Sequence, residues 1–260
     1  AALRCDAQPG YVTMLRPVTE VVGSKQRYYD ARFGEVNRTA AWVNMMLHCE
    51  RATRGFDRAF VRYHDLLDDW TVPVFGLGQR FDLTGTEHVP RRGGVLLAVN
   101  HVGYMDFIYG GLAANPSGRK VRFMAKREIF DHPVTGPVMR SMHHIEVDRG
   151  EGLASFHTAV DYLRRGEAVG IFPEATISRS MDLKEFKTGA VRIAAQAGVP
   201  IVPVILWGTQ RMMTKDHPRD FSRGKTISLT VGEPMHPDGS DPVGQTAQLR
   251  ERMSSMLDDA

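Results

Sequence analysis

His101 and Asp106 are the residues of this chain whose types and spacing best suit acid–base chemistry. The apolar run Val95–Val99, typical of a strand buried on both faces of a sheet, ends directly before Asn100 and His101. Imidazole titrates near pH 6.5, so a carboxylate on one ring nitrogen leaves the other available as a base. On one helix the five-residue separation would place the side chains about 140° apart, so the pair requires a turn, which Gly103 supplies. The alternative interpretation is a His and an Asp that cap the next helix.

Three further groups of polar residues directly follow short apolar runs of the strand type. In an open α/β sheet such strand ends converge on one crevice. This crevice would hold a base, an acid and several cations, and cations suit a phosphate. Taken singly, each charge is equally typical of a solvated strand end or a turn. The groups are Lys126-Arg127 after residues 121–125, Asp148-Arg149 after 145–147, and Pro173-Glu174-Ala175-Thr176 after 168–172.

The elements that position these groups alternate between strand and helix patterns from about residue 80 onward. This alternation predicts an α/β fold with a central mixed, mostly parallel sheet flanked by helices. Helical spacing covers residues 153–163, 186–197 and 246–257, and further strands are expected at 201–206 and 226–231. We therefore assign residues 79–260 to an α/β domain and residues 1–78 to an N-terminal arm and helical segment.

The N-terminal segment is expected to begin as an irregular arm over residues 1–30 and to become helical over residues 32–70. At 100° per residue, one stripe of arginines faces a stripe of large apolar residues. A helix packed on the domain and an interfacial helix among anionic lipid headgroups both fit this pattern, so the segment is a candidate membrane-facing element. The two stripes are Arg51, Arg54, Arg58 and Arg62, and Phe56, Phe60, Tyr63 and Leu67.

Composition narrows the class of protein. The chain is 42% hydrophobic and 24% charged with a formal net charge of +3, so it is no polycation and has no strong nucleic-acid signature. Its two cysteines, Cys5 and Cys49, form no CxxC pattern, which favours a reducing, cytosolic setting. The longest apolar run, near residues 199–207, is far shorter than the roughly 20 residues that span a bilayer. Any work on membranes is expected from the surface, peripherally on the cytoplasmic face.

The stretch His101-Val-Gly-Tyr-Met-Asp106 resembles the HxxxxD motif of the glycerolipid acyltransferase superfamily, the PlsC-like lysophosphatidate acyltransferases. Phe172-Pro-Glu-Ala-Thr176 is similar to the FPEGT motif of that family, and residues 145–149 resemble its arginine motif. HxxxxD alone is a weak signal, but the ordered set is specific. The other similar blocks are residues 126–136, 186–190 and 199–203.

The chain departs from the family pattern at two positions beside Glu174. Ala175 stands where the family usually has Gly, and Ile177 where it often has Arg. Arg179, two positions later, is expected to replace the missing charge.

The resemblance implies acyl transfer from acyl-CoA or acyl carrier protein to the free hydroxyl of 1-acyl-glycerol-3-phosphate in phospholipid biosynthesis. His101 would be the general base and Asp106 would orient it. Glu174 would position the acceptor, and backbone N–H groups near Gly103 or Thr176 would stabilise the oxyanion. The expected partners are acyl-CoA, a lysophospholipid and a membrane surface, without metal, other cofactor or nucleic acid. The expected substrate-binding residues are Lys126, Arg149, Glu174, Thr176, Arg179 and Lys187.

Other functions are also compatible with parts of the pattern. Another acceptor, glycerol-3-phosphate or a lysoglycolipid, is the nearest alternative, and a non-catalytic lipid-binding protein is a more distant one. A hydrolase would require a nucleophile, and the chain has no G-x-S-x-G motif. A metal enzyme would use His101, His143 and His144, but adjacent residues on a strand would point to opposite faces.

Overall fold

The computed structural model describes residues 11–15, 58–62, 79–132, 135–148, 150, 152–178 and 182–258. The chain divides into two compact units, Ala1–Gln79 and Arg80–Ala260. In the first unit, strands β1 (Tyr11–Leu15) and β2 (Arg58–Arg62) form a parallel pair, with Tyr11 opposite Arg58 and Leu15 opposite Arg62.

These two strands correct the predictions for the N-terminal segment. The prediction of an irregular arm is wrong at β1, which is a strand. The prediction of a helix is wrong at β2, a strand that begins at Arg58 and ends at Arg62. Periodicity cannot separate helix from strand over five residues, and the β-branched and aromatic residues of both segments suit a parallel pair. The pairing partner lies more than 40 residues away, so local spacing gives no sign of it. The rest of the predicted helical, membrane-facing segment lies outside the described residues.

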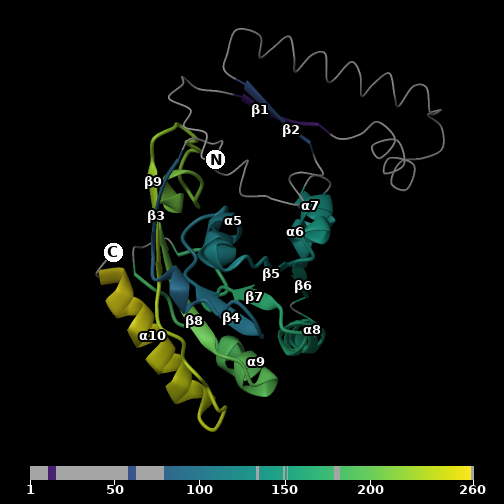
Figure 1. Cartoon of the computed structure of the whole chain (residues 1–260), viewed down its shortest axis with the longest axis vertical. Coiled ribbons are helices and arrows are strands. Elements are labelled where there is room, and N and C mark those ends of the chain that lie inside the picture. Colours follow the sequence, from purple (N-terminus) through teal and green to yellow (C-terminus); the bar gives the residue numbers. More distant parts are fainter. Residues whose placement is uncertain are drawn as a thin grey trace, which may run out of the picture. The chain divides into compact units, whose positions relative to one another are not determined.

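The second unit is built on a seven-stranded sheet with the order β3-β9-β8-β4-β7-β5-β6 (Figure 1). Neighbouring strands run parallel except for the antiparallel pair β8–β9. The predicted mixed, mostly parallel sheet is therefore confirmed. The strands are β3 (Arg80–Thr84), β4 (Val95–Val99), β5 (Val121–Lys126), β6 (Ile145–Val147), β7 (Ala168–Ile171), β8 (Ile201–Trp207) and β9 (Thr226–Val231).

The predicted helices of this unit are present with shifted starts. The last helix begins four residues early, at Pro242, since proline suits the first turn of a helix. Residues 186–188 do not join α9, because the Lys187 N–H donates to the Pro173 carbonyl instead. The helices are α5 (Asp106–Gly110), α6 (Arg127–Asp131), α7 (Thr135–Ser141), α8 (Gly152–Arg164), α9 (Gly189–Ala197) and α10 (Pro242–Asp258), with 3₁₀ turns η1 (Thr86–His88), η2 (Gly111–Ser117) and η3 (Thr209–Arg211).

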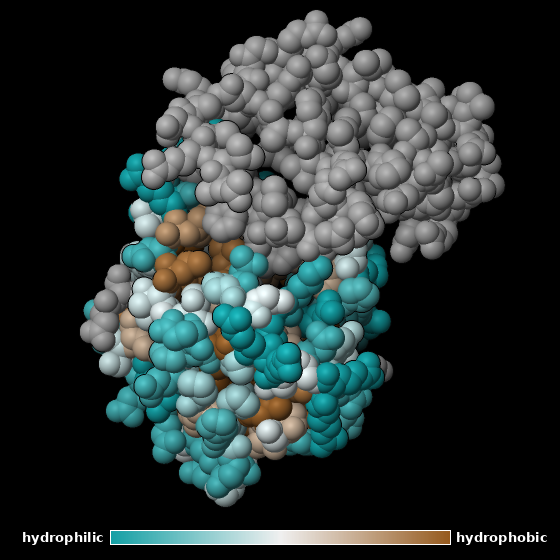
Figure 2. All heavy atoms as spheres, viewed as in Figure 1, coloured by the Kyte–Doolittle hydropathy of each residue, from teal (hydrophilic) through white to brown (hydrophobic). Residues whose placement is uncertain are grey.

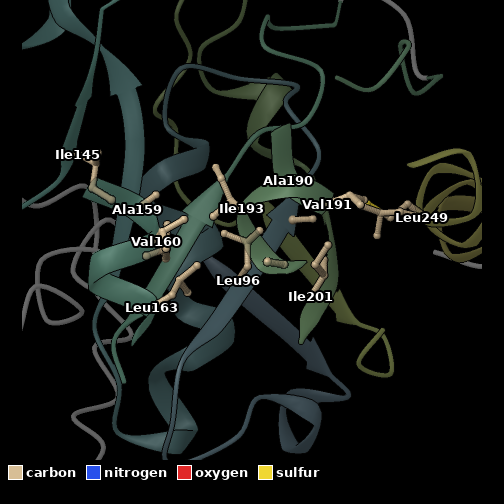
Figure 3. Packing of buried hydrophobic residues seen from close by; sticks show 14 of the residues in the cluster. Leu96, Ile145, Ala159, Val160, Leu163, Ala190, Val191, Ile193, Ile201 and Leu249 are labelled. Atoms are coloured by element: carbon tan, nitrogen blue, oxygen red, sulfur yellow. The ribbon is translucent and has the colours of Figure 1, made fainter. Parts of the chain in front are cut away.

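Helices α8, α9 and α10 cover one face of the sheet. Leu96 of β4 and Ile201 of β8 point into the same cluster as Val160 of α8, Ile193 of α9 and Leu249 of α10, and all five are buried (Figure 3). The burial of all five residues of β4 explains its unbroken apolar run, because a strand covered on both faces has no polar side. Because β4 is packed in this core, the carboxyl end of the strand is held in place in the sheet.

Helix α5 lies on the other face, at the end of β4. A Cβ atom at Gly110 would lie 3.2 Å from Val99 and 3.3 Å from the ring of Phe123, so the absence of a side chain lets α5 approach the sheet closely. The helix begins at Asp106, seven residues beyond Val99, the last buried residue of β4. Hydrophilic residues cover much of the visible face of the second unit (Figure 2). Among the described residues, no helix is long and apolar enough to cross a membrane.

Candidate active site

The predicted polar strand ends lie at one edge of the sheet. Strands β4, β5, β6 and β7 are mutually parallel, so their carboxyl ends share that edge. The structure thereby brings His101, Lys126, Asp148 and Glu174 to the same end of the sheet. Lys126 is the last residue of β5, and the other three shortly follow their strands. Arg149 and Arg179 lie outside the described residues.

His101 and Asp106 form a hydrogen-bonded pair. The imidazole Nδ1 lies 2.9 Å from Asp106 Oδ2. The Asp106 side chain is fully buried, whereas 19% of the His101 side chain is exposed, so only the histidine can meet a substrate. Since a carboxylate only accepts, Nδ1 carries the proton and Nε2 presents its lone pair.

The turn between the two residues is shaped by the Asp106 carboxylate. Its Oδ2 also accepts the backbone N–H groups of Val102 and Gly103, both at 2.7 Å. A Cβ atom at Gly103 would lie 3.0 Å from the Met213 carbonyl oxygen and 3.2 Å from Asp106 Oδ1, which explains why glycine occupies the turn. Because the Gly103 N–H donates to Asp106, this N–H is not available to an oxyanion.

Asn100 anchors the end of β4 to its neighbour β8. Its side-chain nitrogen donates to the Leu206 carbonyl at 3.0 Å, and its side-chain oxygen accepts the Leu206 N–H at 2.7 Å. The amide thus continues the hydrogen-bond ladder where the backbone of β4 turns away, and it is fully buried.

The imidazole also has a defined ring plane. It stacks on Phe172 with centroids 4.2 Å apart and an interplanar angle of 20°, and Phe172 stacks on Phe123 at 5.3 Å. Asp106 fixes one ring edge and Phe172 one ring face, so the direction of the Nε2 lone pair is set before substrate binds.

Glu174 binds the main chain at His101, where the turn begins. Its Oε1 accepts the His101 N–H at 2.8 Å and its Oε2 accepts the Lys184 N–H at 3.1 Å, with 4% of the residue exposed. Burial raises the pKa of this carboxyl group, while the two backbone hydrogen bonds oppose the rise. Both oxygens are thus committed to protein donors, so the geometry favours positioning of His101 over the expected contact with acceptor hydroxyls.

The segment after Glu174 encloses the other side of His101. The Ser178 N–H donates to the His101 carbonyl at 2.6 Å. Ala175 has φ of 55°, a left-handed conformation that costs an L-residue about 1–2 kcal/mol and explains why glycine is usual there. Thr176 is half-buried and accepts a hydrogen bond from Lys215 Nζ at 3.0 Å.

The expected phosphate-binding cations differ in their surroundings. Lys126 and Lys187 are exposed at the strand-end edge. Arg127 instead pairs with Glu146 at 3.0 Å and with Asp148, so its charge is compensated within the protein.

Two residues of the segment after β8 contact the candidate site, although the sequence analysis did not single them out. The Thr209 hydroxyl donates to Asp106 Oδ1 at 2.6 Å, and both side chains are buried. Strand β8 is parallel to β4 and ends at Trp207. The search for polar residues directly after apolar strands, which singled out His101, would therefore also have found Thr209. Lys215 carries no comparable signal, because it lies eight residues beyond the strand.

His143 and His144, considered above as metal ligands on a strand, lie outside the strands of the structure. They lie in the turn after α7, where His143 adopts φ of 54° and His144 Nδ1 accepts the Phe123 N–H at 2.9 Å. The hydrogen bond to Phe123 and the burial of His144 both stabilise this turn. Both depend on residues far away in the sequence, so the local sequence does not predict them. The described part of the chain holds no group of three or more His, Cys, Asp or Glu side chains arranged to bind a metal.

Comparisons with known proteins identify the family of this chain. The family model described as acyltransferase matches residues 80–207, a range that holds both His101 and Thr176. A 1-acyl-sn-glycerol-3-phosphate acyltransferase of Bacillus subtilis is 34% identical over 151 residues, which cover 58% of this chain and 71% of that protein. The chain belongs to the acyltransferase family. This membership confirms the resemblance read from the motifs.

Two further members of the family extend the comparison. A 1-acyl-sn-glycerol-3-phosphate acyltransferase of Borreliella burgdorferi is 32% identical over 166 residues, which cover 62% of this chain and 63% of that protein. The crystal structure of the 1-acyl-sn-glycerophosphate acyltransferase PlsC from Thermotoga maritima has a TM-score of 0.60 at 18% identity and covers 93% of this chain and 94% of its own. The acyltransferase fold is therefore shared.

Proposed function

We propose that the chain transfers an acyl group from acyl-CoA or acyl carrier protein to the free hydroxyl of 1-acyl-glycerol-3-phosphate. The observation that carries the proposal is the partly exposed His101 imidazole with its Nδ1 on the buried Asp106 carboxylate. A base held in this tautomer activates a hydroxyl, and no residue of the protein then needs to act as a nucleophile. The printed names of the relatives support the choice of acceptor.

The proposed reaction begins at the Nε2 lone pair of His101, which is free to accept a proton. His101 Nε2 accepts the proton as the acceptor oxygen attacks the thioester carbonyl. Asp106 stabilises the imidazolium that forms. The tetrahedral intermediate then collapses, the carbon–sulfur bond breaks, and Nε2 returns its proton to the departing thiolate. The products are the diacylated acceptor and a free thiol, and the enzyme is unchanged.

The remaining parts of the proposal concern substrate and location. Lys126, Arg149, Arg179 and Lys187 are proposed to attract the acceptor phosphate, since lysine and arginine both bind phosphate. The acyl donor is a substrate, and the mechanism employs no metal or other cofactor. The enzyme is proposed to act peripherally on the cytoplasmic face of the membrane that holds its lipid acceptor, and nucleic acid has no part in the reaction.

Thiol release from palmitoyl-CoA tests the proposal. The wild type should release thiol only when 1-acyl-glycerol-3-phosphate is present, and His101→Ala should lower kcat by about 10²–10⁴ because the general base is lost. His157→Ala, an exposed histidine on α8, is the matched control and should retain activity.

Three outcomes separate the proposal from its alternatives. Release without acceptor would identify a thioesterase. Release only with glycerol-3-phosphate or a lysoglycolipid would correct the acceptor. Acceptor-dependent release that survives His101→Ala would reject the general base.

A further inference from the structure

Lys215 lies on the loop that follows β8, and its side chain reaches the segment after Glu174. Its Nζ donates to Thr176 Oγ1 at 3.0 Å. Thr176 lies between Glu174 and Ser178, whose hydrogen bonds hold the His101 N–H and carbonyl. The ammonium group therefore meets the segment that encloses the catalytic histidine.

The loop that carries Lys215 is fixed to the catalytic turn. The Tyr104 N–H donates to the Met213 carbonyl at 2.9 Å, and the Thr214 hydroxyl donates to the Val102 carbonyl at 2.7 Å. Thr214 is the neighbour of Lys215, so the position of the ammonium group is tied to the turn between His101 and Asp106.

The charge of Lys215 is not compensated by a carboxylate within the described part of the chain. Thr176, a neutral hydroxyl, is the polar partner of its Nζ there. Lys225, at the end of the same connection, instead lies 2.9 Å from Asp220. The neighbour of Thr176, Ile177, is apolar and buried at 5% exposure, so it adds no charge. This half-buried ammonium group has no carboxylate partner among the described residues, and the adjacent Thr176 hydroxyl retains its own proton to donate. Such a pair suits a bound anion.

We infer that Lys215 and Thr176 bind the phosphate monoester of a substrate, with Lys215 as the cation that sets the preference for phosphorylated substrates. This inference rests on the proposed function and adds a specific residue to it. Two substrates of the proposed reaction carry such a group, namely the acceptor phosphate and the 3′-phosphate of coenzyme A.

Steady-state kinetics of Lys215→Met test the inference. Methionine retains much of the length of lysine and removes its charge. The KM for the phosphorylated substrate should rise about ten- to hundredfold, as expected for the loss of a hydrogen bond to a charged group, while kcat changes less than threefold. Lys215→Arg should recover most of the affinity, and Thr176→Val should raise the same KM by a smaller factor. Lys120→Met is the control, because this exposed lysine precedes β5 at the opposite edge of the sheet.

The two sources of phosphate are distinguished by varying the donor. If the acceptor phosphate is bound, Lys215→Met raises the KM for 1-acyl-glycerol-3-phosphate equally with palmitoyl-CoA and with palmitoyl-dephospho-CoA. If the donor phosphate is bound, the substitution raises the KM for palmitoyl-CoA and has no effect on that for palmitoyl-dephospho-CoA.

A fall in kcat with both KM values unchanged, or no change in any constant, would overturn the inference and leave Lys215 a structural contact. Both results require an active wild type. A wild type without acceptor-dependent thiol release would instead refute the proposed function, so the two failures are distinguishable.

Discussion

The Asp106 carboxylate receives four donors from two parts of the chain, residues 101–103 and Thr209. They are the His101 ring, two backbone N–H groups of the turn, and the Thr209 hydroxyl from the loop after β8. Three of these donors come from within five residues of Asp106, and among the described residues only Thr209 joins the carboxylate itself to a distant segment of the chain. Thr209 is therefore the contact that fixes the carboxylate relative to the sheet and not only relative to its own turn.

Thr209→Val should lower kcat about tenfold and leave both KM values within a factor of two. Valine preserves the shape of threonine but leaves Asp106 Oδ1 without its hydroxyl donor, and hydrogen bonds to charged groups contribute about 1.5–3 kcal/mol. Thiol-release kinetics measure the effect. Thr209→Ser should restore activity because it retains the hydroxyl, and equal activity of the valine and serine variants would refute a positioning role.

At the scale of elements, the sequence predicts most of what positions the site. The apolar runs at β4, β7 and β8 identify buried strands, and the polar residues after β4 and β7 mark the end of the sheet that holds the candidate site. Contacts that join distant segments leave no local signal. The parallel pairing of β1 with β2 is one example, and the hydrogen bond from Lys215 to Thr176 is another. The role of Glu174 shows the same limit, because its backbone partners are set by the tertiary fold.

Asn100→Ala should destabilise the second unit by about 2–5 kcal/mol. The substitution leaves the N–H and carbonyl of Leu206 buried and without their side-chain partner, and each unsatisfied buried group costs about 1–3 kcal/mol. Urea unfolding monitored by circular dichroism gives the change in the free energy of unfolding. Asn115→Ala, at an exposed position in η2, should change it by less than about 0.5 kcal/mol. Equal stability of the two variants would show that the β4–β8 junction does not depend on the amide.

At the scale of the whole molecule, one buried histidine links stability to pH. His144 accepts the Phe123 N–H through Nδ1, and its ring contacts Phe123 and Phe107 edge-on. Burial, followed by the positive charge of Arg122 and then His143, lowers the pKa of His144 to about 4. An unfolded histidine titrates near 6.5, so the unfolded chain binds a proton between these two values that the folded chain does not bind. The stabilisation is complete above pH 6.5, is lost as the pH falls toward 4, and does not change further below 4.

The His144 contribution to the free energy of unfolding should therefore fall by up to about 3 kcal/mol between pH 7 and pH 4, since each pKa unit corresponds to about 1.4 kcal/mol. Urea unfolding at pH 7.5, 5.5 and 4.5 measures the slope. His144→Asn removes the titrating group and retains an oxygen that can accept the Phe123 N–H, so the variant should lose most of this slope between pH 6.5 and 4.5. His157→Asn, at an exposed position on α8, should keep it. If the His144 variant retained the wild-type slope, the acid sensitivity would arise from other groups, and the buried imidazole would be only a packing residue.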